Sequence, residues 1–211
     1  MADESDGSGD RGSSVEFVVA ILLGIGAILT AYAAYNGALA GGDALKGYTQ
    51  SSRTTSDANA YYAEYSQTYD ADAALFLQYQ LLVEKGDTDT AQVIKDNLFS
   101  DRLTTATDAW LALPEGEGPA TPLATEEYVV EDYDTAQQLT QQAEDEFNEA
   151  QRIDDQGDKF DLAAVYLAIS LFFAGMAALF KIRRNQLILL AISGLAVVPG
   201  LYAIGQGKGW I

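Results

Sequence analysis

The fold is decided by the stretch LAAVYLAISLFFAGMAALFKIRRNQLILLAISGLAVVPGLYAIGQG, residues 162–207 of this 211-residue chain. It contains two runs without a charged residue, 162–180 and 185–207, which are 19 and 23 residues long. About 20 apolar residues in helical conformation cross the hydrocarbon core of a bilayer. The stretch therefore predicts two membrane helices joined by a short basic turn.

A third run without charge, FVVAILLGIGAILTAYAAY, covers residues 17–35. A cleaved signal peptide would place a basic segment before a shorter apolar run. Here the preceding residues ADESDGSGDR are acidic overall, and the run is 19 residues long. We therefore interpret it as another membrane helix.

The predicted fold class is all-α, with three transmembrane helices plus an extramembrane antiparallel helical bundle. The expected order along the chain is a disordered acidic N-terminal tail (1–14), transmembrane helix 1 (15–40), an acidic extramembrane helical domain (41–160), transmembrane helix 2 (161–180), a basic cytoplasmic turn (181–186), transmembrane helix 3 (187–205) and a C-terminal tail (206–211).

The basic turn predicts the orientation of the chain. Short loops rich in Lys and Arg stay on the cytoplasmic side of a membrane. Lys181, Arg183 and Arg184 therefore place the N-terminus in the cytoplasm and residues 41–160 outside the cell. Tyr202 and Trp210 are then expected to anchor the chain at the outer interface. An alternative role for the three basic residues is binding of lipid headgroups.

The middle of the chain carries the excess negative charge. The chain has 31 acidic and 12 basic residues, a net charge of −19, and residues 41–161 hold 26 of the acids but only 7 of the bases. An acidic surface with little lysine stays hydrated in concentrated salt, so we expect a halophilic source. The alternative is a merely acidic protein. The same charge excludes nucleic acid as a partner, because no basic patch exists to replace phosphate counterions.

The chain contains no cysteine and no histidine. This composition excludes disulfides, thiolate chemistry, Cys/His zinc sites and imidazole catalysis. We expect no catalytic residue, no cofactor and no metal site. The acidic stretches KGDTDT (85–90) and RIDDQGDKFD (152–161) lack the spacing of an EF-hand, and we interpret them as helix caps and solvated surface. A weak cation site at 154–161 is the alternative.

Helical periodicity organises the acidic segment. A helix is expected over about 57–84, capped by Ser56 or Asp57, with Gly41-Gly42 favouring a break before it and Lys85-Gly86-Asp87 ending it. A second helix, capped by Asp87 or Asp89, has an apolar face from Ile94 to Leu113. A third begins near Asp132 or Asp134.

Two side-chain patterns indicate packing faces. Tyr61, Tyr65, Tyr69 and Phe76 recur at helical spacing, which suits either core packing or a face for self-association. Gly26, Thr30, Ala34 and Ala38 recur every four residues in the first apolar run. Small residues allow helices to approach closely in lipid, either among the three spans of one chain or between copies.

Residues 157–205, GDKFDLAAVYLAISLFFAGMAALFKIRRNQLILLAISGLAVVPGLYAIG, resemble the C-terminal half of an uncharacterised family of prokaryotic three-span membrane proteins, a domain of unknown function. The positions that carry the resemblance are mostly apolar, together with Asp158, Asp161 and Arg183. The first span and DANAYYAEYSQTYDADAALFLQYQ (57–80) are similar in kind. The resemblance implies a helical segment between span 1 and spans 2–3, and it implies no activity.

Taken together, these patterns predict a non-enzymatic integral membrane protein. Its external bundle is expected to mediate homo-oligomerisation or assembly with another membrane protein or envelope complex, with membrane lipid as its other partner. The alternative is an oligomeric ion channel or pore, with Thr30, Ser170 or Ser193 as the polar lining.

Overall fold

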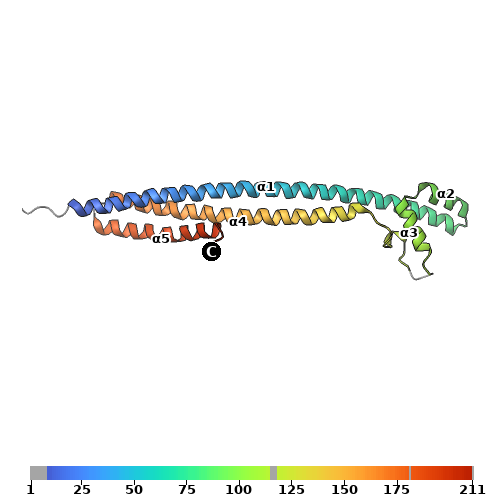
Figure 1. Ribbon diagram of the computed structural model, residues 1–211. Coiled ribbons are helices and arrows are strands. Elements are labelled where there is room, and N and C mark those ends of the chain that lie inside the picture. The colour runs from blue at the N-terminus through green and yellow to red at the C-terminus, as the bar shows by residue number, and fades with distance from the viewer. Residues whose placement is uncertain (1–8, 115–117, 181, 211) are drawn as a thin grey trace, which may run out of the picture. The chain divides into compact units, whose positions relative to one another are not determined.

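The computed structural model describes residues 9–114, 118–180 and 182–210 (Figure 1). Lys181 and the first eight residues of the predicted tail lie outside these ranges. Within them the fold is all-α, as predicted from the sequence. The elements are α1 (Gly9–Glu84), α2 (Thr88–Leu98), α3 (Asp101–Leu111), a 3₁₀ helix (Pro122–Ala124), α4 (Glu131–Leu179) and α5 (Arg183–Gly207).

Three of the described helices, α1, α4 and α5, are long and apolar enough to cross a membrane. The three charge-free runs of the sequence lie in these helices, apart from Phe180, which follows α4. The chain is therefore a membrane protein with three candidate membrane helices. Where the bilayer begins and ends along each helix stays a prediction.

The chain packs as two compact units. The apolar unit comprises the described parts of residues 1–49 and 146–211, and the acidic unit comprises those of residues 50–145. Helices α1 and α4 contribute to both units, whereas α5 belongs to the apolar unit and α2 and α3 to the acidic unit.

Helix α1 corrects two expectations. It runs for 76 residues without the break predicted at Gly41-Gly42, and it begins at Gly9, so residues 9–14 of the predicted tail are helical. Ser56 does not cap a new helix, because its hydroxyl donates to the Ser52 carbonyl at 2.9 Å within the continuing helix. Once a helix is nucleated, each added residue gains a hydrogen bond, which offsets the cost of about 1 kcal/mol for a glycine.

Small side chains form much of the core of the apolar unit. Ala33 of α1 packs with Ala163 and Leu167 of α4 and with Ala203 and Ile204 of α5. Phe160 is the one aromatic ring of this buried cluster. The three segments lie side by side (Figure 1). Because small side chains leave little between the helices, they can approach closely.

The ends of α1 and α5 have the same turn. Gly86 and Gly209 adopt positive φ angles of 80° and 69°. After α5, the Gly209 and Trp210 amides donate to the Gln206 and Gly205 carbonyls at 3.0 and 2.9 Å. Gly86 and the residue after it form the equivalent bonds after α1, so the predicted stop at 85–87 is confirmed.

The acidic unit contains two short helices where one was predicted. The chain leaves the helix at Phe99, and the Ser100 hydroxyl caps α3 by accepting from the Leu103 amide at 3.2 Å. Asp87 caps α2 by accepting from the Thr90 amide, also at 3.2 Å. The break at Phe99 has a packing reason, since the apolar core of this unit combines Phe76 of α1, Leu103 of α3 and Leu123 of the 3₁₀ helix, with Phe99 against them.

Candidate functional site

The small-residue face predicted on α1 is only partly a packing face within the chain. Gly26 lies against Leu171 of α4, and the Thr30 hydroxyl donates to the Gly26 carbonyl at 2.8 Å. Ala34 and Ala38 are exposed. Four residues advance an α-helix about 40° beyond one full turn. A strict four-residue repeat therefore rotates away from the neighbouring helix.

Between residues 33 and 58, a row of buried or half-buried residues follows one side of α1 at alternating steps of four and three. The row consists of Ala33, Gly37, Ala40, Ala44, Gly47, Ser51, Thr54 and Ala58, and the half-buried Asn36 and Tyr48 lie beside it. The steps average about 3.6 residues, the period of a straight α-helix, so the row stays on one side of α1. Sequence reasoning missed this face because it counted steps of four.

Glycine sets the distance between α1 and α4 in the apolar unit. A Cβ atom at Gly47 would lie 2.7 Å from the Cβ and 3.3 Å from the Cα of Ala150. A Cβ atom at Gly157 would lie 3.2 Å from the Cβ of Ala40. Each of the two helices therefore presents a glycine at a place where the other approaches closely.

The predicted aromatic stripe divides into a core part and a surface part. Phe76 is buried, and Tyr69 is half-buried, with its ring 6.0 Å from that of Tyr128. For these two residues the core-packing interpretation is confirmed. Tyr61 is exposed, and Tyr65 is half-buried against the ring of Tyr133 at 4.9 Å.

The surface part includes two tyrosines that the sequence pattern did not single out. Tyr62 is 54% exposed and Tyr133 is 38% exposed, and their ring centroids lie 6.3 Å apart. We call Tyr61, Tyr62, Tyr65 and Tyr133 the tyrosine surface. It joins α1 to α4 within the acidic unit. The three-residue step from Tyr62 to Tyr65 could have indicated that these two tyrosines lie on the same side of the helix.

A buried carboxylate ties together three segments of the acidic unit. The side chain of Asp72 on α1 is 5% exposed and accepts from Arg102 Nε at 2.8 Å. It also accepts from the Ser100 hydroxyl at 3.1 Å and from the Tyr128 hydroxyl at 3.0 Å. Sequence reasoning missed this site. One sequence pattern could have indicated the site: Asp72 lies three residues after Tyr69 and four residues before Phe76, so it falls on an otherwise apolar helix face.

Tyr128→Phe is expected to flatten the loss of stability at high pH. Burial, and then the hydrogen bond to Asp72, raise the pKa of Tyr128 above its usual value of about 10. The phenol of Tyr128 therefore loses its proton at a higher pH in the folded state than in the unfolded chain. The resulting stabilisation is present below about pH 10 and is lost as the pH rises towards the folded-state pKa.

Urea midpoints measured from about pH 9 to about pH 11 should therefore fall less steeply for Tyr128→Phe than for the wild type. Tyr62→Phe controls for the loss of an exposed phenol. Equal slopes for the wild type and Tyr128→Phe would contradict this expectation.

The two described arginines of the basic turn and the predicted anchors lie at the surface. Arg183 and Arg184 are exposed at the start of α5. Tyr202 and Trp210 are also exposed, and the Tyr202 hydroxyl accepts from Gln206 Nε2 at 3.0 Å. Exposure is what either an interface anchor or a headgroup ligand requires.

Lys208 attaches the C-terminal end of α5 to α1. Its ammonium group donates to Asn36 Oδ1 at 3.1 Å. The same group lies 5.5 Å from the ring centre of Tyr32 and 5.7 Å from that of Phe160. These cation–π and hydrogen-bond contacts hold residues of the predicted C-terminal tail against the apolar unit.

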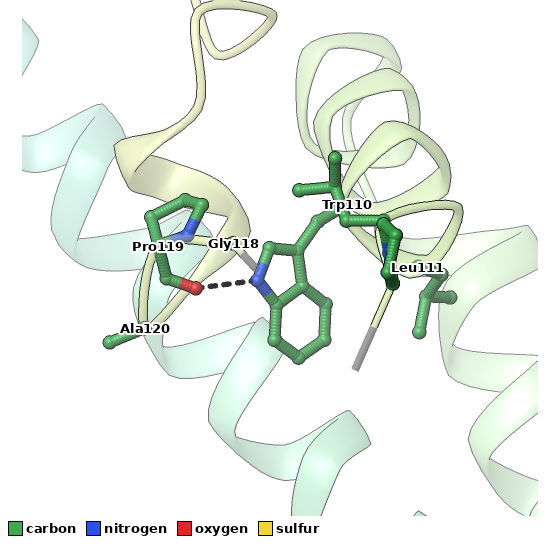
Figure 2. A pocket seen from close by; sticks show the side chains of 7 residues that line it. Trp110, Leu111, Gly118, Pro119 and Ala120 are labelled. Atoms are coloured by element: carbon green, nitrogen blue, oxygen red, sulfur yellow. Dashed lines mark hydrogen bonds between the residues drawn. The ribbon is translucent and has the colours of Figure 1, made fainter. Parts of the chain in front are cut away.

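A hollow of about 440 Å³ lies beside Trp110 in the acidic unit. Figure 2 shows the indole lying between α3 and the segment that contains Pro119. The indole N–H donates to the Pro119 carbonyl at 2.8 Å. We assign no ligand to the hollow, because residues 115–117, which connect its two sides, lie outside the described residues.

The hydroxyls considered for a pore lining are engaged within the chain. The hydroxyls of Ser170 on α4 and Ser193 on α5 are buried and lie 2.9 Å apart, within hydrogen-bond distance. Thr30 donates to its own helix. A pore lined by these groups would have to break the bonds that they make here.

Comparisons with protein-family models, with curated proteins and with solved structures gave no match. The family resemblance of residues 157–205 therefore stays a prediction.

Proposed function

We propose that this protein is a non-enzymatic membrane protein of a halophilic organism, and that copies of its acidic unit associate through the tyrosine surface. The supporting observation is the exposure of Tyr61, Tyr62 and Tyr133 on a unit otherwise rich in acids. Each tyrosine ring offers a large apolar area for burial and keeps a hydroxyl at its edge. Tyrosine is also enriched at protein–protein interfaces.

A second copy of the chain is the partner that the membrane favours. Copies inserted in one orientation are related by rotation about an axis normal to the membrane, so a surface of one copy can meet the same surface of the next. We further propose that Lys181, Arg183 and Arg184 keep the turn between α4 and α5 in the cytoplasm. Residues 41–160 then lie outside the cell.

Salt decides whether such a contact is stable. The sequence from residue 50 to residue 145 carries 19 acidic and 4 basic residues, so two copies repel each other at low ionic strength. The Debye length falls from about 10 Å in 0.1 M salt to about 3 Å in 1 M salt. Concentrated salt removes this repulsion and leaves the apolar contact between rings.

Self-association is therefore expected to require salt and the tyrosine surface. The full chain in mild detergent should be oligomeric in about 3 M salt and dissociate in about 0.1 M salt, as measured by light scattering with detergent correction. The double variant Tyr62→Ser/Tyr133→Ser should be monomeric in both.

Val93→Ser is the matched control, because Val93 is as exposed as Tyr62 but lies on α2. It should associate like the wild type. A wild-type chain that is monomeric in concentrated salt would overturn the proposal. Oligomers of the double variant as stable as those of the wild type would assign the contact to another surface.

A further inference from the structure

The three helices of the apolar unit line a partly open cavity of about 100 Å³. Leu22, Ile25 and Gly26 of α1 line one side. Ser170 of α4, and Ser193 and Gly194 of α5, contribute to the other sides. All three helices are candidate membrane helices, and the lining residues fall within their charge-free runs.

The cavity is apolar despite its two serines. The Ser170 and Ser193 hydroxyls are within hydrogen-bond distance of each other, so neither depends on a guest for a partner. A buried water needs two to four polar partners, and a cavity lined by apolar groups stays dry and accepts apolar guests. An apolar guest is therefore favoured over water.

The mouth of the cavity lies on the surface of the bundle. Leu22 is 46% exposed and Ile25 is 52% exposed, although both line the cavity. Gly194 is exposed too, and a Cβ atom built on it would meet nothing within 4 Å. Gly26 differs, since its Cβ atom would lie 2.7 Å from a methyl carbon of Leu171. Gly26 therefore serves helix contact, whereas Gly194 keeps space open.

We infer that this cavity binds a hydrocarbon chain, which in the native bilayer is the chain of a membrane lipid. Lipid chains are the solvent around a membrane-spanning surface, and the mouth opens to that solvent. A chain that enters would fill space that the protein leaves empty and would restore the dispersion contacts that an empty cavity loses. The inference does not depend on self-association.

Two measurements on the full chain test the inference. Xenon serves as a small apolar probe of the cavity, followed by xenon NMR of the protein in detergent. Native mass spectrometry of the delipidated protein, after addition of dioleoyl phosphatidylcholine, detects a retained lipid molecule. The wild type is expected to show both the bound-xenon signal and the retained lipid.

Gly194→Leu is expected to lose both signals, because the new side chain occupies the cavity. Gly24→Leu is the matched control, since Gly24 also lies in an apolar helix, is exposed and has nothing within 4 Å, but does not line the cavity. It should keep both signals. If Gly194→Leu fails to fold, Gly194→Ala should weaken both signals.

Three results would overturn the inference: no bound xenon in the wild type, bound xenon without a retained lipid, or signals that survive in Gly194→Leu. Bound xenon without lipid would mean that free apolar molecules, not lipid chains, are the guests.

Discussion

Asp72→Ala is expected to destabilise the acidic unit by about 3 kcal/mol. Removing one partner of a buried ion pair leaves the other charge without compensation, which costs about 3–5 kcal/mol. The lower end applies here, because the side chain of Arg102 is 36% exposed and can be partly hydrated. The Ser100 and Tyr128 hydroxyls would also lose an acceptor.

Urea unfolding followed by Trp110 fluorescence measures this loss. Trp110 packs edge-on against Phe76 at 5.7 Å in the same unit, so its emission reports the core next to Asp72. Trp210→Phe in all variants removes the other tryptophan. Arg102→Met in the Asp72→Ala background should restore part of the stability, because it removes the uncompensated charge.

Asp108→Ala is the control for a pair with an exposed carboxylate. Asp108 is paired with Lys95, and their side chains are 59% and 13% exposed. Water around an exposed carboxylate screens the pair, so this variant should lose less stability than Asp72→Ala. A loss for Asp72→Ala no larger than that for Asp108→Ala would show that the buried network does not hold the unit together.

The sequence predicted the parts of the fold that depend on local rules. The charge-free runs predicted the three candidate membrane helices, and the Lys85-Gly86-Asp87 signal predicted the end of α1. Each of these patterns depends only on residues that are close in sequence or belong to one helix. The start of α4 at Glu131 lies close to the predicted Asp132 for the same reason.

The errors arose where two distant segments decide the outcome. Gly41-Gly42 was expected to interrupt α1, but the pairing of neighbouring residues with α4 supports a continuous helix. The site at Asp72 needs residues from positions 100, 102 and 128, which no local pattern brings together. The tyrosine surface likewise needed the pairing of Tyr62 with Tyr133.

Gly47→Leu is expected to destabilise the apolar unit by about 2 kcal/mol, whereas Gly42→Leu should stabilise it slightly. Leucine is favoured over glycine in a helix by about 0.8 kcal/mol, which applies at both positions. A Cβ atom at Gly42 meets nothing within 4 Å, so nothing opposes the gain there. A Cβ atom at Gly47 would lie 3.3 Å from the Cα of Ala150, so the backbone of α4 must move.

Overpacking of this kind costs about 1–3 kcal/mol, which exceeds the gain in helix propensity. Thermal unfolding in detergent, followed by circular dichroism, should therefore give shifts of opposite sign for the two variants. The chain has no cysteine, so single cysteines introduced at the exposed positions Thr49 and Asn148 can carry spin labels. The distance between the labels should increase in Gly47→Leu and stay unchanged in Gly42→Leu. Equal distances and equal melting temperatures would mean that α1 and α4 are not held together by close approach at this glycine.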